Sequence, residues 1–288
     1  MSQPPDTTVE TLARPMLEVD TVLRDLRVPW GLARTGDGTL FVSERSGRIL
    51  ALPPDSDSAA LWATLDVYSE EPGIGPETGL LGIAVLPGTD SAPVLYALAT
   101  TWRTTRDRSR GLGMRLWRRL AGRVRADGAL KFKNQVLRLE RLRTGAIRRT
   151  VVVDDLATNH YHAGGAVAFG PDGMLYFSLG DALTPALARH PNAFVGKILR
   201  YTPAGGVPAD NPTAGSPVWA TGLRNTQALL WLPGGSLLGT DHGPSGMSQE
   251  GGRAGNDELN LLQPGRDYGW PNVIGRERAS GVVSPVWS

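Results

Sequence analysis

One pattern recurs four times along this chain of 288 residues, and it limits the possible folds more than any other feature. Each copy has two apolar runs of strand length around a Gly, Pro or Asp turn, which is typical of a β-hairpin. The copies are GLARTGDGTLFVSE from Gly31, GLLGIAVLPGTDSAPVLYALAT from Gly79, GGAVAFGPDGMLYFSLGD from Gly164 and TQALLWLPGGSLLGTDHG from Thr226. Recurrence of one hairpin at long intervals indicates a radial array of sheets, in which neighbours bury each other's faces.

The spacing of the copies sets the size of the repeating unit. Equivalent leucines at 40, 95, 175 and 237 are separated by 55, 80 and 62 residues. Removing an insertion of roughly 25 residues from the middle interval restores a unit near 55, slightly longer than common propeller blades of about 40 to 50. We therefore predict an all-β fold, a single β-propeller domain over residues 1–288, with about four to five blades of four strands each.

Composition supports this fold and excludes others. Gly and Pro together make up a fifth of the residues, where ordinary usage is roughly 12%, and so much turn chemistry argues against a helical bundle. The absence of cysteine excludes disulfides and thiolate metal sites. No Gly-x-Ser-x-Gly elbow, phosphate-binding loop or dinucleotide fingerprint is present, which argues against several enzyme classes.

A basic insertion over residues 102–130 interrupts the repeat. Sixteen Lys and Arg face three acidic residues between Trp102 and Arg149, which leaves a net charge of −11 for the remaining chain. Apolar residues at helical spacing within the insertion alternate with arginines, so the segment reads as a basic amphipathic helix. Residues 102–125 could contact an anionic membrane, but capping of a neighbouring apolar surface is the favoured interpretation, and no nucleic-acid partner is expected.

The chain ends carry few signals of location. No apolar run of eighteen residues is present, so no transmembrane helix is expected. Residues 1–20 are predicted to be a flexible segment, and the opening MSQPPDTTVE lacks the residue order of a secretory signal.

Only four histidines are present, and two of them lie before a strand. His160 and His162 precede the third hairpin, at a position where the loops of repeat folds carry function. An imidazole with an ordinary pKa near 6.5 suits proton removal at neutral pH. A structural role remains the alternative, and a zinc site lacks an evident third ligand.

A second polar cluster follows the fourth hairpin. Thr240–Pro244 and Gly255–Asn260 supply carboxylates and backbone carbonyls, which are the ligands that Ca²⁺ prefers. The alternative is an acidic turn in water. Arg224 and Asn225 stand in another loop between strands, where they could polarise an oxygen atom of a ligand or tie a turn together.

The chain resembles the soluble quinoprotein glucose/sorbosone and aldose sugar dehydrogenases, which use pyrroloquinoline quinone (PQQ). Six segments carry the resemblance in the same order, namely GLLGIA at 79–84, HAGG followed by AFGPDGMLY from 162, GKILR at 196–200, GLRN at 222–225, HGP at 242–244 and DELNLLQPGRDYGWPNV at 257–273. The resemblance covers about residues 28–273, and it implies a propeller of the six-bladed family type.

The resemblance also implies a role for individual residues. It makes His162 the general base, places Arg224 and Asn225 at the reactive quinone carbonyl, and matches Glu77 to a position that contacts cofactor or sugar. It further implies metal ligands at four positions. Backbone carbonyls of Gly243 and Pro244 correspond to ligands of a calcium ion that bridges quinone and protein, and Glu258 and Tyr268 to ligands of a second calcium.

The implied function is oxidation of an aldose to its lactone, with PQQ and Ca²⁺ as cofactors and an external electron acceptor as partner. Hydride would pass to the calcium-bound quinone. Members of the family generally work in the periplasm or outside the cell, although this sequence shows no signal peptide. The oligomeric state stays open.

This chain departs from the family pattern in ways that keep two alternatives open. Ala166 and Tyr161 stand where the family often has an arginine and some members an acid, and only 274–288 follow the GWPNV segment. The family's later segments supply cations for the carboxylates of the quinone, and each such bond contributes about 1.5 to 3 kcal/mol. The chain is therefore expected to be a truncated or degenerate member. A non-catalytic binding propeller and a Ca²⁺-dependent lactonase-type hydrolase remain as other functions.

Overall fold

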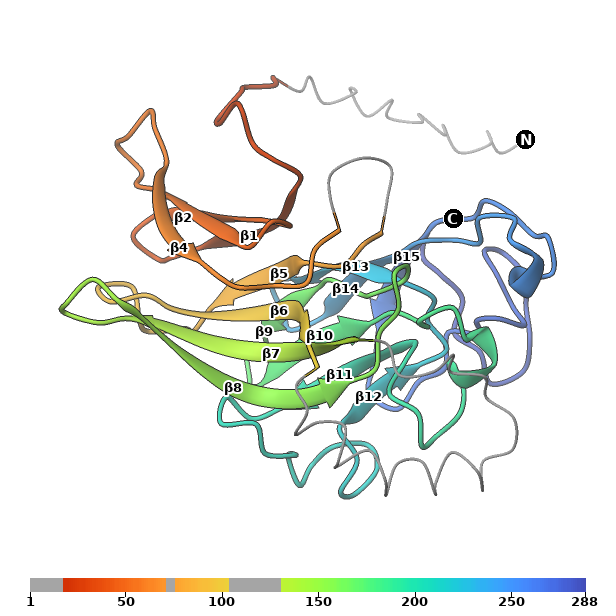
Figure 1. Cartoon of the computed structure of the whole chain (residues 1–288). Helices are drawn as coiled ribbons and strands as arrows, with labels where there is room; N and C mark the ends of the chain where they lie inside the picture. The colour runs from red at the N-terminus through yellow and green to blue at the C-terminus, as the bar shows by residue number, and fades with distance from the viewer. Residues whose placement is uncertain (1–17, 71–75, 104–130) are drawn as a thin grey trace, which may run out of the picture.

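The computed structural model describes residues 18–70, 76–103 and 131–288, with the side chain of Gln249 excepted. Most of the segment predicted at 1–20 and nearly all of the basic insertion at 102–130 lie outside the described residues. Within those ranges, fifteen strands form four sheets (Figure 1).

Each sheet is built from strands in chain order, with antiparallel neighbours. The first sheet contains β1 (Pro29–Arg34), β2 (Leu40–Glu44), β3 (Arg48–Leu52) and β4 (Ala60–Thr64). The second contains β5 (Leu80–Val85), β6 (Val94–Trp102), β7 (Phe132–Arg141) and β8 (Ile147–Leu156). The third contains β9 (Val167–Phe169), β10 (Leu175–Leu179), β11 (Lys197–Tyr201) and β12 (Val218–Thr221). The fourth contains β13 (Thr226–Trp231), β14 (Leu237–Asp241) and β15 (Glu258–Leu262).

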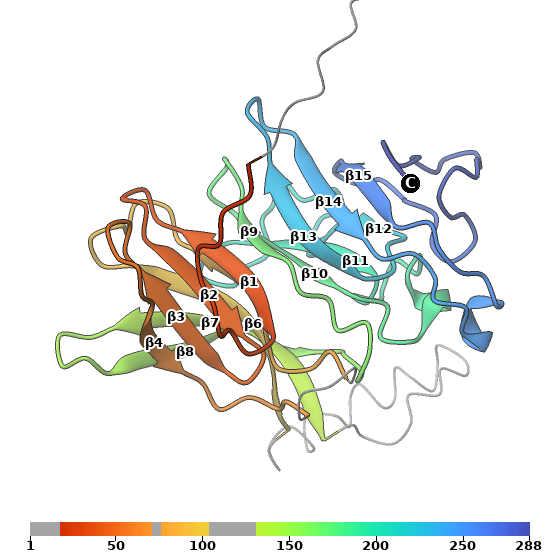
Figure 2. The ribbon, with the colours of Figure 1, turned by 90° about the horizontal axis from the view of Figure 1, so that it is seen from above.

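The four hairpins of the sequence repeat open the four sheets. They are β1–β2, β5–β6, β9–β10 and β13–β14. The first strand of each sheet contacts the first strand of the next, and Figure 2 shows the sheets following one another from orange to blue. The predicted propeller is confirmed with four blades, but the last sheet has three strands in the described residues instead of the predicted four. The described residues form no fifth sheet, because the chain after β15 folds back and the Leu259 N–H donates to the Trp287 carbonyl at 2.9 Å.

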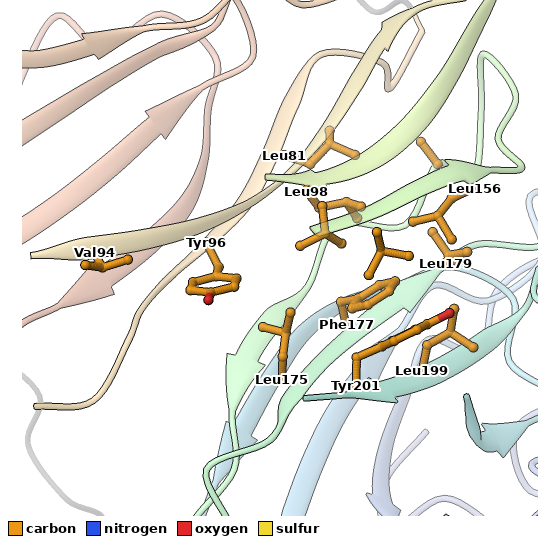
Figure 3. Packing of buried hydrophobic residues seen from close by; sticks show 13 residues of the cluster. Leu81, Val94, Tyr96, Leu98, Leu156, Leu175, Phe177, Leu179, Leu199 and Tyr201 are labelled. Carbon is orange, nitrogen blue, oxygen red and sulfur yellow. The ribbon is translucent and has the colours of Figure 1, made fainter. Parts of the chain in front are cut away.

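Apolar side chains fill the space between consecutive sheets. One cluster, which includes Phe41 and Leu137, joins the first two sheets, and another, which includes Tyr176 and Leu262, joins the last two. The cluster of Figure 3 joins the second and third sheets, where the rings of Phe177 and Tyr201 stack at 5.6 Å. Each large side chain buried in this way contributes roughly 1.5 to 3 kcal/mol.

Buried polar side chains also link each sheet to the next. Ser43 Oγ donates to the Leu81 carbonyl at 2.6 Å, Asn134 Nδ2 to the Ala163 carbonyl at 2.9 Å, and Ser178 Oγ to the Thr226 carbonyl at 2.7 Å. These bonds fix the first strand of one sheet, or the segment just before it, against a strand of the preceding sheet. They therefore fix the position of the loops before β5, β9 and β13 along the strand direction.

The first strands pack backbone against backbone. A Cβ atom at Gly82 of β5 would lie 1.9 Å from the Gly165 carbonyl oxygen, just before β9. A Cβ atom at Gly31 of β1 would lie 2.9 Å from the Gly82 Cα. Only glycine permits this approach at either position.

No helical segment within residues 18–70, 76–103 or 131–288 reaches the length and hydrophobicity that a bilayer crossing requires.

Replacement of Gly82 by alanine should destabilise the fold. The added methyl group overlaps the Gly165 carbonyl, and overpacking of this kind costs about 1 to 3 kcal/mol or more. Urea unfolding followed by circular dichroism measures the change. Gly206→Ala is the matched control, because this exposed glycine has no Cβ neighbour nearer than Thr202 Oγ1 at 3.3 Å. Equal stability of the two variants would contradict the close packing.

Candidate functional site

The site lies at the end of the sheets where the first strands begin. Glu77 precedes β5, His162 precedes β9, and Arg224 with Asn225 precedes β13. The second strand of each sheet runs back toward the same end, so Asp241 finishes β14 there. Residues far apart in the chain therefore meet because the repeat places equivalent loops side by side.

A buried carboxylate orients the His162 ring. His162 Nδ1 lies 2.7 Å from Asp181 Oδ1, and their side chains are 5% and 0% exposed. Asp181 also accepts hydrogen bonds from the Leu183 N–H at 2.9 Å and from Trp270 Nε1 at 2.8 Å. A carboxylate at Nδ1 favours the tautomer with its proton on that nitrogen. His162 Nε2 bonds to none of the described residues, so it is the nitrogen available to accept a proton.

Glu77 joins the loops of three sheets through a single oxygen atom. Its Oε2 accepts hydrogen bonds from the His162 N–H at 2.8 Å, the Ala163 N–H at 3.3 Å and Asn225 Nδ2 at 3.0 Å. The Asn225 Oδ1 in turn accepts the Gly164 N–H at 3.1 Å. The other Glu77 oxygen bonds to none of the described residues, which leaves it open to a ligand hydroxyl.

Asp241 holds the loop that carries Arg224 and Asn225. Its carboxylate accepts both backbone N–H groups at 2.8 Å and Thr226 Oγ1 at 3.0 Å. Burial raises the pKa of Asp241 above its ordinary value, although these hydrogen bonds and the Arg224 charge oppose the shift.

The Arg224 guanidinium is buried and has several partners. Nε donates to Glu250 Oε1 at 2.6 Å, Nη2 donates to Ser245 Oγ at 2.9 Å, and the Trp270 ring lies 5.6 Å away. Nη1 reaches only the His242 carbonyl, at 3.4 Å. The positive charge is therefore fixed in place by the protein.

A cavity of about 10 Å³ lies beside Arg224, and all four predicted metal ligands line it. These are Gly243, Pro244, Glu258 and Tyr268. This volume suits one water-sized occupant. The resemblance implies two separate calcium ions for these residues, whereas here they border one cavity.

The cavity is rich in oxygen atoms. Asp241, which also lines it, lies directly opposite Glu258 on neighbouring strands. Burial, reinforced by the Asp241 charge, raises the pKa of Glu258 to about 7. The Tyr268 hydroxyl donates a hydrogen bond to the Leu261 carbonyl at 2.7 Å. The backbone carbonyl of Tyr268 is therefore the oxygen of this residue that could bind a metal ion. The described residues contain no group of three His, Cys, Asp or Glu that could hold a metal ion, so carbonyls would have to supply most of the ligands.

The structure thus brings the predicted residues into two adjoining sets. Hydrogen bonds connect Glu77, His162 and Asn225, and Arg224 borders the cavity that the predicted metal ligands line.

Three partners were missed in the sequence, namely Asp181, Glu250 and Trp270, and Asp241 was expected only as a carboxylate of the polar cluster after the fourth hairpin, not as the residue that holds the Arg224 loop. Asp181 and Asp241 each stand at or just after the end of a second strand, in the segments SLGD and GTD, and this shared position could have identified them.

The chain is similar to several known proteins. The glucose/sorbosone dehydrogenase family matches residues 26–285. Quinoprotein glucose dehydrogenase B of Acinetobacter calcoaceticus is 26% identical over 93% of this chain and 55% of its own length. An aldose sugar dehydrogenase of Escherichia coli is 34% identical over 43% of this chain and 33% of its own.

A solved structure extends the likeness to three dimensions. The PQQ-bound form of aldose sugar dehydrogenase from Streptomyces coelicolor superposes with a TM-score of 0.73 at 30% identity, covering 93% of this chain and 70% of that one. This chain spans only 55% of the length of the Acinetobacter relative. Because the family match covers most of the chain, this protein belongs to the glucose/sorbosone dehydrogenase family.

Proposed function

We propose that this chain carries the site of a PQQ-dependent dehydrogenase that oxidises an aldose to its lactone and passes the electrons to an external acceptor. The buried Asp181–His162 pair carries the proposal, because it leaves Nε2 as a proton acceptor at the mouth of the first strands. The neighbouring Glu77 and Asn225 add polar groups that suit a sugar and a quinone.

His162 is the proposed general base. Its Nε2 takes the proton of the anomeric hydroxyl, while Asp181 keeps the ring oriented and stabilises the imidazolium that forms. The second oxygen of Glu77 accepts a hydrogen bond from a sugar hydroxyl and so fixes the sugar relative to the base. No side chain of the protein can accept a hydride, and bound PQQ supplies that chemistry.

The polar groups near His162 fit such a cofactor. Arg224 Nη1 makes only one long hydrogen bond, to the His242 carbonyl at 3.4 Å, and retains donor capacity for a ligand oxygen. Asn225 Nδ2 makes a single bond, to Glu77, and has a second hydrogen to offer. Both groups would stabilise negative charge on an oxygen of the bound quinone.

The oxygen-rich cavity fits Ca²⁺. Gly243, Pro244, Glu258 and Tyr268 would supply carbonyl and carboxylate ligands, as a hard cation requires. A Ca²⁺ ion there would add two positive charges beside Arg224.

Two other functions have weaker support. A binding propeller without catalysis would leave the orientation of His162 by Asp181 without a purpose. A Ca²⁺-dependent lactonase needs several carboxylates around one metal ion, and within the described residues the cavity offers only Asp241 and Glu258.

Reconstitution of the purified chain with PQQ and Ca²⁺ distinguishes the three functions. Uptake of the quinone is followed by its absorbance, and turnover by dye reduction with glucose and other aldoses. The dehydrogenase takes up PQQ and reduces dye. Uptake without turnover would favour a binding propeller, and hydrolysis of a lactone without PQQ would favour the hydrolase. No uptake at all would refute the proposal for this chain.

Replacement of His162 by glutamine should abolish most of the turnover. Loss of a general base lowers kcat by about 10² to 10⁴, while PQQ affinity stays within a few-fold because Arg224, Asn225 and the cavity are unchanged. Steady-state dye reduction and a PQQ titration measure the two quantities. His190→Gln is the control, since His190 lies in the 185–196 loop and its side chain accepts a hydrogen bond only from the nearby Asn192 N–H. Unchanged kcat in His162→Gln would remove this residue from the mechanism.

Calcium should stabilise the chain most at alkaline pH. Burial raises the pKa of Glu258 from 4.5 to about 7 in the folded chain. The folded state therefore binds a proton more tightly than the unfolded state, and the metal-free chain loses this stabilisation as the pH rises from about 4.5 through 7. Ca²⁺ at about a hundred times its Kd adds about 2.7 kcal/mol, or about 5 °C in Tm.

A thermal melt at pH 8 and pH 6 tests this expectation. The calcium shift should be smaller at pH 6, where protons compete for Glu258, and it should vanish in Glu258→Gln. An equal shift in wild type and variant would place the ion elsewhere.

A further inference from the structure

Glu250 holds the Arg224 guanidinium from one side. Glu250 Oε1 lies 2.6 Å from both Nε and Nη2 of Arg224, and the two side chains are 3% and 0% exposed. Ser245 Oγ accepts a further hydrogen bond from Nη2 at 2.9 Å. The Trp270 ring lies 5.6 Å from the guanidinium carbon. These contacts occupy two of the three guanidinium nitrogens and one face of the group.

Glu250 is itself fixed within a closed loop, residues 245–254. Its Oε2 accepts the Ser245 N–H at 2.8 Å and the Met247 N–H at 3.1 Å. The loop is closed by hydrogen bonds from the Gly246 N–H to the Arg253 carbonyl and from the Gly255 N–H to the Pro244 carbonyl, both at 2.8 Å. The loop connects two segments that line the cavity, one that ends at Pro244 and one that begins at Asn256. The carboxylate therefore cannot shift without opening its own loop.

The charge state of Glu250 suits this role. Burial would raise the pKa of Glu250, but the hydrogen bonds from Arg224 and Ser245 and the Arg224 charge outweigh it and hold the pKa below its ordinary value. The carboxylate is thus ionised at neutral pH, and a buried ion pair with short hydrogen bonds orients a guanidinium far more strictly than solvent would.

We propose that Glu250 is a positioning residue of the sugar dehydrogenase site, which fixes Arg224 so that Nη1 is the nitrogen left to face a ligand oxygen. The inference rests on the proposed function, and it adds a residue that lies in none of the segments that carry the family resemblance. Nη1 lies near the His242 carbonyl at the wall of the cavity. Free rotation of the guanidinium would spread its donors over several directions and weaken the bond to a ligand.

Trp270 extends this effect to the base. Its ring faces Arg224, and its Nε1–H donates to Asp181, which orients His162. If Glu250 no longer holds Arg224, the Trp270 ring loses a fixed neighbour, and its hydrogen bond to Asp181 is held less firmly. Both consequences lower kcat more than they change the binding of the sugar.

Two substitutions at Glu250 test the proposal, with a control on a neighbouring ion pair. Glu250→Gln removes the charge, and its single carbonyl oxygen cannot serve Arg224 and the two backbone N–H groups together. Glu250→Asp keeps the charge and shortens the reach. Glu277→Gln is the control, because Glu277 lies 3.8 Å from Arg253 of the same loop and does not contact Arg224.

Three measurements are expected to change together in Glu250→Gln. Hydrogen exchange at Arg224 Nε, followed by NMR of ¹⁵N-arginine-labelled protein, becomes at least tenfold faster without any cofactor. The Kd for PQQ rises about tenfold, and kcat for the aldose falls about tenfold, while KM for the sugar stays within twofold. Glu250→Asp recovers part of each loss, and Glu277→Gln behaves as wild type.

Other outcomes would overturn the inference. Unchanged exchange at Arg224 Nε would show that Glu250 does not hold the guanidinium, and a lower Tm with unchanged PQQ affinity and kcat would show a structural role only. If Glu250→Gln does not fold, Ser245→Ala loosens Nη2 alone and should give a smaller change in the same direction. If the wild-type chain takes up no PQQ, the proposed function fails separately, and the exchange measurement still decides whether Glu250 anchors Arg224.

Discussion

The backbone contact between the first strands of neighbouring sheets is the constraint on which the site depends. At Gly31 and Gly82 no side chain separates the strand from the backbone of the next sheet, so the loops that precede these sheets emerge close to each other. Glu77 and Asn225 are 148 positions apart, yet their side chains lie 3.0 Å from each other. A larger residue at Gly82 would push β5 away from the segment before β9 and separate Glu77 from the His162 and Ala163 N–H groups.

Carboxylates convert this proximity into a fixed geometry, and of the three that do so Asp181 and Asp241 are buried and Glu77 is half-buried. Asp181, Glu77 and Asp241 each accept hydrogen bonds from a loop of a different part of the chain, and two of them receive at least two backbone N–H groups. A carboxylate in such a place costs several kcal/mol unless it is well partnered. The cost is offset by hydrogen bonds whose directions are set by the loops. The result is a site whose polar groups are oriented before any ligand arrives, which is the arrangement that stabilises developing charge most effectively.

The sequence predicted the architecture well because the repeat is local. The turns Asp37-Gly38, Asp172-Gly173 and Gly234-Gly235 each lie between two apolar runs, and all three became the turns of opening hairpins. The positions of His162, Glu77 and Asn225 in equivalent loops also followed from the repeat and the family resemblance.

The partners of these residues were not predictable in the same way. Asp181 is 19 positions from His162, and Glu250 is 26 from Arg224. No periodic pattern connects such residues, because their contacts depend on the curvature of the loops between the strands. Glu250 also lies in a loop without apolar spacing, which a linear pattern does not distinguish from a solvent-exposed turn.

The charges around Arg224 give the electrostatic reason to propose a cation in the cavity. Asp241 and Glu250 are buried and Glu258 is half-buried around one buried arginine, so the carboxylates exceed the cation by two. Glu250 is neutralised by Arg224, whereas Asp241 and Glu258 face each other across neighbouring strands with raised pKa values. The metal-free chain relieves this repulsion by keeping a proton on one of the two carboxylates. A divalent cation would remove the excess charge entirely and release that proton, and it would leave Glu250 free to serve Arg224 alone.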